Sequence, residues 1–180
     1  MLSRICSIIQ CPFIDLALAC EKEGITYQGF IFFGLIKVNN EPMVIEYNVR
    51  MGDPETEAVI PRIESDLLEL LAAVPDKNLN KFDCKISEQT ATTIMLVSGG
   101  YPEDYQKGKL MTGFSEVKNS LLFHAGTKEN KGTILSNGGR VLAITTLDAN
   151  KEEALKKGYE DAEKIKFDKV YYRKDIGFDI

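Results

Sequence analysis

The 180-residue chain has no tryptophan, a single histidine and only four cysteines. The cysteines, Cys6, Cys11, Cys20 and Cys84, contain no C-x-x-C pair. Together with His124 they therefore predict neither a zinc site nor a disulfide framework. Free cysteines in such an arrangement are typical of a reducing cytoplasm, which is the location we expect.

Long apolar runs and positive charge are also scarce. The apolar residues of the first twenty positions are interrupted by Gln10, Pro12 and Asp15, so a signal peptide is not predicted, and no later run could span a bilayer. The net charge of -5 gives no general attraction to nucleic acid or to anionic membranes, so we expect neither partner. With 44% hydrophobic residues the chain can still bury a core.

The N-terminal half predicts an antiparallel hairpin and a helix. Residues 26–38 read as an almost continuous apolar strand, suited to a sheet that is covered on both faces. The turn signal "NNEP" separates them from a second strand over 43–50. Apolar residues in 62–74 are spaced to line one face of a helix, which we expect to lie on the sheet.

A polar break at 75–82 precedes a change of pattern, so we place a domain boundary there. Asn150 predicts the N-cap of a helix with Glu153 at its third position, and the buried stripe of this helix is Ala154, Gly158, Ala162 and Ile165. The remaining sequence predicts short strands, and the whole chain is therefore of the α+β class. These strands are expected over 81–87, 90–98, 120–126, 132–136, 138–147 and 167–178.

The stretch "VIEYNVRMGDPETE" (44–57) carries the strongest candidate site. Strand alternation places Glu46, Asn48 and Arg50 on one face. A carboxylate and an amide oxygen at this spacing suit magnesium, and Arg50 could hold a phosphate or carboxylate by paired hydrogen bonds. The alternative is a half-exposed strand with three polar residues facing water, and the spacing alone does not decide between them.

The following residues predict a capped helix. Gly52 permits a tight turn, Asp53 can cap, and Pro54 suits the first helical position. Such a helix would direct its free amide groups toward the strand end near Arg50. The alternative is a well-formed cap that binds no ligand.

"NVRMGDPETE" resembles the signature of the glycinamide ribonucleotide synthetases, also called phosphoribosylamine-glycine ligases, which are ATP-grasp enzymes of purine synthesis. The family pattern is Arg, then Leu or Phe, then Gly-Asp-Pro-Glu, any residue, and Glu or Gln; Met51 replaces the Leu or Phe. The segments "GFIFFGLIKV", "VSGGYP", "FHAGT", "NGGRVLAITTL" and "FDKVYYRKDIGF" also look like the C-terminal portion of that family, in the same order.

The resemblance implies a division into three parts. It begins near Glu23 and assigns 23–77 to the end of an ATP-grasp domain and 78–180 to a small, β-rich C-terminal domain with one helix, similar to hybrid-motif folds. Residues 1–22 form a divergent N-terminal segment of uncertain structure. Hybrid-motif folds include biotinyl carriers, but the chain has no Met-Lys-Met hairpin, so a carrier role is not expected.

The resemblance also implies a reaction, in which ATP activates glycine as an acyl phosphate and 5-phosphoribosylamine attacks it. Glu46 and Asn48 match the ligands of Mg²⁺ (or Mn²⁺), and Arg50 matches a catalytic electrostatic clamp. A further set matches substrate-binding positions beside the acyl phosphate and the ribonucleotide. This set is Gly52, Asp53, Pro54, Glu55 and, for an anionic group, Arg140. His124, in an apolar segment, is expected to be a satisfied strand residue.

The family also has an N-terminal domain and an ATP-binding half that these 180 residues do not contain. We therefore expect the chain alone to be inactive and a companion N-terminal chain to supply the rest. The alternative is a noncatalytic remnant or interaction module of the same family. An exposed sheet edge or apolar patch would predict self-association.

Overall fold

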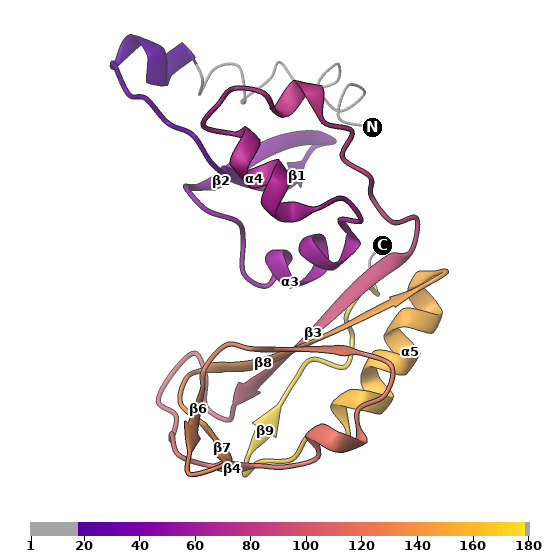
Figure 1. Cartoon of the computed structure of the whole chain (residues 1–180). Helices are drawn as coiled ribbons and strands as arrows, with labels where there is room; N and C mark the ends of the chain where they lie inside the picture. Colours follow the sequence, from indigo (N-terminus) through magenta and orange to yellow (C-terminus); the bar gives the residue numbers. More distant parts are fainter. Residues whose placement is uncertain (1–17, 179–180) are drawn as a thin grey trace. The chain divides into compact units, whose positions relative to one another are not determined.

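The computed structural model describes residues 18–178 and contains two compact units (Figure 1). Unit 1 comprises Met1–Gly52 and Leu68–Phe82, and unit 2 comprises Asp53–Leu67 and Asp83–Ile180. Most of the divergent segment predicted over 1–22 lies outside the described residues. The units group residues by packing, so the predicted domain boundary after residue 77 stays a prediction. Within 18–178 no helix has both the length and the apolarity to cross a membrane.

Unit 1 is built on the predicted hairpin. Strands β1 (Phe32–Val38) and β2 (Glu41–Asn48) pair antiparallel. Asn39 and Asn40 connect them with φ of 50° and 69°, the left-handed conformation that a two-residue hairpin turn requires. The hairpin prediction is therefore confirmed.

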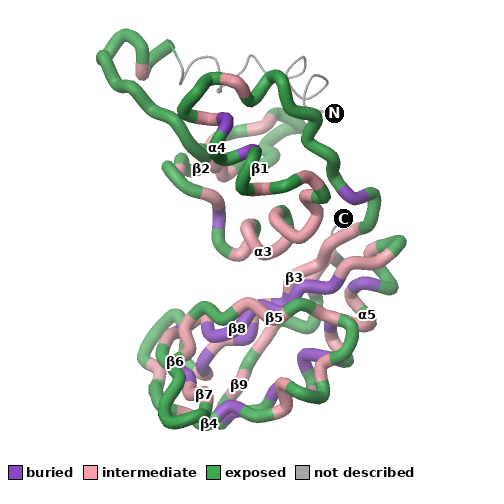
Figure 2. Tube along the Cα trace, in the orientation of Figure 1, coloured by how far each residue is buried: buried purple, intermediate pink, exposed green. Residues whose placement is uncertain are grey.

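The predicted burial of the first strand is wrong. β1 begins at Phe32 rather than Thr26, and its second half is exposed. The physical reason is that, among residues 18–178, its sheet has two strands, so little in the described part of the chain covers either face. Figure 2 shows most of the hairpin as exposed, and Ile36 and Ile45 have 51% and 64% of their surface accessible. The hairpin thus presents an apolar surface.

The helix predicted over 62–74 is shorter than expected. A 3₁₀ turn, η1 (Ile60–Arg62), is followed by extended backbone at Ile63, which pairs with Ile86, and helix α4 begins only afterwards (Leu67–Ala73). The apolar periodicity over 62–74 therefore spans two elements, the extended backbone at Ile63 and helix α4.

The strand predicted over 81–87 is not present. The segment begins in a second 3₁₀ turn, η2 (Leu79–Lys81), and later forms only the single bridge at Ile86. The Ser65 hydroxyl donates to Asp83 O (3.1 Å) and accepts from Lys85 N (2.8 Å). Because this side chain satisfies backbone groups that a strand would pair, no ladder forms.

Unit 2 contains two antiparallel sheets. In the larger, the order is β5 (Leu121–His124), β8 (Arg140–Asp148), β3 (Thr90–Ser98) and β9 (Val170–Tyr171). In the smaller, it is β4 (Leu110–Met111), β7 (Thr133–Ser136) and β6 (Thr127–Asn130). The predicted strands at β3, β5, β7 and β8 are confirmed. β4 and β6 were not predicted, and the last predicted strand is reduced to β9.

Helix α5 (Lys151–Ala162) packs against β3 and β8 and closes the core. Its cap is as predicted, because Asn150 Oδ1 accepts a hydrogen bond from Glu153 N at 2.9 Å. The predicted stripe is buried, with Ile165 just beyond the helix end. The core has Ile94, Leu96, Leu142 and Ile144 at its centre, where β3 and β8 are coloured as buried in Figure 2. The structure is α+β, as predicted.

Candidate functional site

Glu46 and Asn48 lie together on one face of the hairpin, as the strand alternation predicts. Asn48 Nδ2 donates a hydrogen bond to Glu46 Oε1 at 3.0 Å. Their partners across the hairpin are Gly34 and Phe32, respectively. The end of β2 therefore presents a carboxylate and an amide side by side at an accessible edge.

Gly34, which the sequence did not single out, makes room for the Glu46 side chain. A Cβ added to Gly34 would lie 2.8 Å from Glu46 Cγ, closer than carbon atoms approach without a shift. The Glu46 side chain therefore folds over the space that the glycine leaves. The available signal was a glycine within the apolar strand "FFGLIKV", which often marks such a close approach.

Arg50 is not placed as strand alternation predicts. β2 ends at Asn48, so the alternation stops before Arg50 is reached. Its Nη1 donates to the carbonyl oxygen of Met51 at 2.9 Å, and the residue is exposed. Just before it, Tyr27 Oη lies 2.7 Å from Phe30 O and 3.0 Å from Val49 O, and its single O–H can donate to either carbonyl. This side chain links the two segments where the chain leaves the strand.

The helix after the turn is present but its predicted cap is not. Helix α3 (Glu55–Val59) has five residues, and Pro54, which occupies the N-cap position, makes no side-chain capping bond. Asp53, the predicted cap, lies one position before the N-cap and is joined to Pro54 by a cis peptide bond. A helix this short supplies little dipole, so the predicted anion site at its N-terminus has no support from the fold.

Asp53 instead contacts Arg140, although 87 positions separate them. Arg140 Nη1 donates to the Asp53 carbonyl oxygen at 2.6 Å, and Nη2 lies 3.5 Å from Asp53 Oδ2. Both residues belong to unit 2, whereas Glu46, Asn48 and Arg50 belong to unit 1. The boundary between the units falls after Gly52, inside the signature stretch, so the candidate residues are divided between the two units.

The glycine pairs Gly99–Gly100 and Gly138–Gly139 lie where two segments of unit 2 approach each other closely. A Cβ on Gly99 would lie 2.7 Å from Lys169 O, and a Cβ on Gly139 would enter the ring of Tyr101. These close contacts explain why both positions are glycine. Gly99 also borders a polar pocket of about 300 Å³, where Lys109 Nζ pairs with Asp168 Oδ2 at 2.5 Å and lowers the pKa of that carboxyl.

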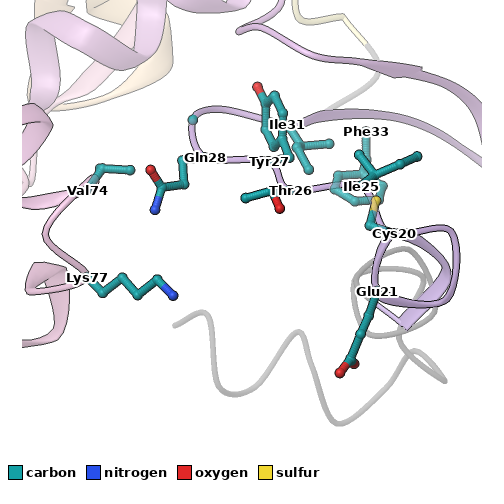
Figure 3. Close-up of a pocket in the computed structure, with 12 residues that line it drawn as sticks. Cys20, Glu21, Ile25, Thr26, Tyr27, Gln28, Ile31, Phe33, Val74 and Lys77 are labelled. Carbon is teal, nitrogen blue, oxygen red and sulfur yellow. The ribbon is translucent and has the colours of Figure 1, made fainter.

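A larger pocket, of about 810 Å³, lies in unit 1 (Figure 3). Its apolar wall includes Phe33 and Val74, and Gln28 and Lys77 direct their polar ends toward the open space. Phe33 pairs with Tyr47, whose side chain alternates with those of Glu46 and Asn48. The pocket wall and the candidate metal ligands therefore occupy opposite faces of the hairpin.

Within residues 18–178 no cluster of three or more His, Cys, Asp or Glu side chains is placed to hold a metal. Any cation at Glu46 and Asn48 would thus need further ligands from substrate, water or other residues.

His124 is satisfied, as expected, because its Nδ1 lies 2.9 Å from Thr127 Oγ1 and its ring stacks on Phe114.

Two family models match the chain. The family model "Phosphoribosylglycinamide synthetase, ATP-grasp (A) domain" matches residues 4–56, and the model "Phosphoribosylglycinamide synthetase, C domain" matches residues 91–179. The fold is thus that of the end of an ATP-grasp ligase together with its C domain. The chain belongs to the phosphoribosylglycinamide synthetase family. The first model match begins at residue 4, whereas the resemblance read from the sequence begins near Glu23.

Individual relatives give the same result. The chain is 40% identical over 158 residues to a phosphoribosylamine-glycine ligase of Caldanaerobacter subterraneus, covering 88% of the chain and 38% of that protein. It is 42% identical over 178 residues to a bifunctional purine biosynthetic protein of Schizosaccharomyces pombe, covering 98% of the chain and 22% of that protein.

A solved structure is also similar. The crystal structure of phosphoribosylamine-glycine ligase from Thermotoga maritima has a TM-score of 0.73 and 35% identity, covering 88% of the chain and 39% of that protein. The chain therefore spans roughly two fifths, or less, of the relatives it matches.

Proposed function

We propose that the chain contributes the metal and acyl-phosphate edge of a phosphoribosylamine-glycine ligase, which joins glycine to 5-phosphoribosylamine at the expense of ATP in purine biosynthesis. The observation that carries the proposal is the adjacent pair Glu46 and Asn48, at the end of the strand that leads into the family signature. We infer a cytoplasmic location from the family and from the cysteine content, with no nucleic-acid or membrane partner.

The pair fits part of a magnesium or manganese site. Both side chains offer hard oxygen atoms, and Mg²⁺ usually completes its shell with water and substrate phosphates. In the structure it is the amide nitrogen of Asn48 that faces Glu46, so binding would require the amide to present its oxygen. A divalent cation held there would neutralise phosphate charge during transfer to the glycine carboxylate.

The remaining residues are proposed for substrate binding and charge stabilisation. Arg50 is exposed beside the signature turn, where its guanidinium could exchange the Met51 carbonyl for an anionic group. Gly52, Asp53, Pro54 and Glu55 would border the acyl phosphate. Arg140 has five N–H donors, so its contact with Asp53 leaves donors for an anionic group as well.

We further propose that turnover depends on the upstream part of the family's sequence, which a companion polypeptide could supply. A noncatalytic interaction module is the second candidate, and the exposed apolar surface of the hairpin favours it. The two differ in whether the Glu46 carboxylate has a chemical role.

The test is an ATP- and glycine-dependent ligation assay with freshly prepared phosphoribosylamine. The 180-residue chain would be assayed alone and with the N-terminal portion of the Caldanaerobacter enzyme. We expect no turnover alone and measurable turnover with the added fragment. Turnover by the chain alone would contradict the proposed dependence, whereas an assembled but inactive complex would favour the noncatalytic module.

A further inference from the structure

The contact between Arg140 and Asp53 joins the start of β8 to the signature turn. The shorter of its two contacts goes to the backbone of Asp53, and the guanidinium is partly shielded, with 40% of the side chain exposed. A hydrogen bond from a charged donor to a carbonyl is stronger than one between neutral groups. The contact therefore restrains the backbone, whichever way the Asp53 carboxylate points.

The loop that carries Arg140 is itself fixed. Ser98 Oγ donates to Gly138 O at 2.8 Å, and Ser98 N donates to Gly139 O at 2.8 Å. The ring of Tyr101 fills the space beside Gly139, where no side chain would fit. The segment 138–139 is thus held against the end of β3, and Arg140 extends from a rigid base.

From this geometry we propose that Arg140 is a positioning residue that clamps the Asp53 carbonyl and thereby fixes the signature turn and the start of α3. The clamp gives the "NGGR" segment a function that does not require a ligand. Its consequence for ligation rests on the proposed function, in which the turn borders the acyl phosphate. The clamp itself is a property of the isolated chain.

Hydrogen exchange followed by mass spectrometry, on the whole chain, measures the clamp without turnover. In Arg140→Ala we expect the peptide covering 52–60 to exchange about tenfold faster, since the loss of a charge-assisted hydrogen bond shifts the local opening equilibrium by that order. Asp53→Asn should have a smaller effect, because the carbonyl contact remains. Arg173→Ala is the matched control, since it removes an exposed arginine that pairs with Asp175 in the same unit.

Chemical rescue separates positioning from general destabilisation. Millimolar guanidinium chloride should restore slow exchange to Arg140→Ala, whereas the same concentration of sodium chloride should not. Unchanged exchange at 52–60 in Arg140→Ala, or an equal increase in Arg173→Ala, would overturn the proposal. None of these outcomes depends on whether ligation is observed.

Discussion

Replacement of Asp161 should test how unit 2 is held together. Asp161 lies on α5 with none of its surface exposed. Its carboxylate accepts hydrogen bonds from Asn119 N (2.8 Å), Ser120 Oγ (2.9 Å), Lys164 Nζ (2.7 Å) and, more weakly, Lys118 N (3.4 Å). It thereby ties the segment before β5 to the helix that covers the sheet.

The expected cost of Asp161→Ala follows from what each donor can do afterwards. Ser120 Oγ also lies 2.7 Å from Thr146 Oγ1, so its hydroxyl can turn to that partner. Lys164 is 30% exposed and can return to water. Asn119 N loses its acceptor, and the loss of a hydrogen bond to a charged group costs roughly 1.5–3 kcal/mol. With the lost bonds of the other donors, we expect the free energy of unfolding to fall by about 2–4 kcal/mol.

Guanidinium denaturation followed by far-UV circular dichroism measures this loss, since the chain has no tryptophan to report on it. Asp161→Asn, which keeps one acceptor oxygen, should lose roughly half as much. Asn119→Ala is a useful control, because it leaves the backbone donor in place and should change little. A loss below about 0.5 kcal/mol in Asp161→Ala would refute the reasoning, because it would show that the donors find other partners.

We also expect the loss of stability in Asp161→Ala to depend on pH. Burial disfavours the ionised form of Asp161, but the hydrogen bonds from Lys164, Asn119 and Ser120 outweigh it and lower its pKa from 3.8. A lowered pKa in the folded state means that the stabilisation is present above the unfolded pKa and is lost as pH falls through the folded pKa. The difference between the unmodified chain and Asp161→Ala should therefore be constant near neutral pH and shrink below about pH 4.

Two further predictions concern the hairpin of unit 1. Gly34→Ala should displace the Glu46 side chain and separate it from Asn48, with little loss of stability. Nuclear magnetic resonance of the Asn48 side-chain amide measures the separation, and an unchanged resonance would count against the prediction. Ile45→Asp, which removes a 64% exposed apolar side chain, should reduce concentration-dependent self-association seen by light scattering. A clean monomer of the unmodified chain at high concentration would show that the exposed apolar surface does not drive association.

The elements that the sequence predicted well are those whose signals are local. β3 and β8 each contain an unbroken apolar run, at 94–97 and 141–144, and the cap of α5 joins Asn150 to Glu153, three positions away. The segments 62–74 and 81–87 were misassigned because they pair with each other at about twenty positions' separation. The Ser65 hydroxyl bonds to the backbone of Asp83 and Lys85, and the bridge beside Ile63 is held by bonds from Glu64 N to Lys85 O and from Ser87 N to Arg62 O. No periodicity in a single sequence contains that information.

The candidate site likewise contains one contact that the sequence could predict and others that depend on the fold. The pairing of Glu46 with Asn48 follows from alternation within one strand, so it could be predicted. The space that Gly34 leaves depends on the register of the hairpin, and the contact of Arg140 with Asp53 depends on the fold of unit 2. Family resemblance pointed to the signature stretch but not to these supporting contacts.

The most direct test of the metal edge uses Mn²⁺ as a paramagnetic probe of the isolated chain. A partial site of two ligands should bind weakly, so millimolar Mn²⁺ should selectively broaden the Asn48 side-chain amide and the backbone amides at the end of β2. Glu46→Gln should abolish this broadening, while Glu129→Gln, an exposed acidic residue in β6, should leave it intact. Broadening at Asn48 that persists in Glu46→Gln, or that is absent from the unmodified chain, would contradict the assignment of this edge as the metal-binding part of the ligase.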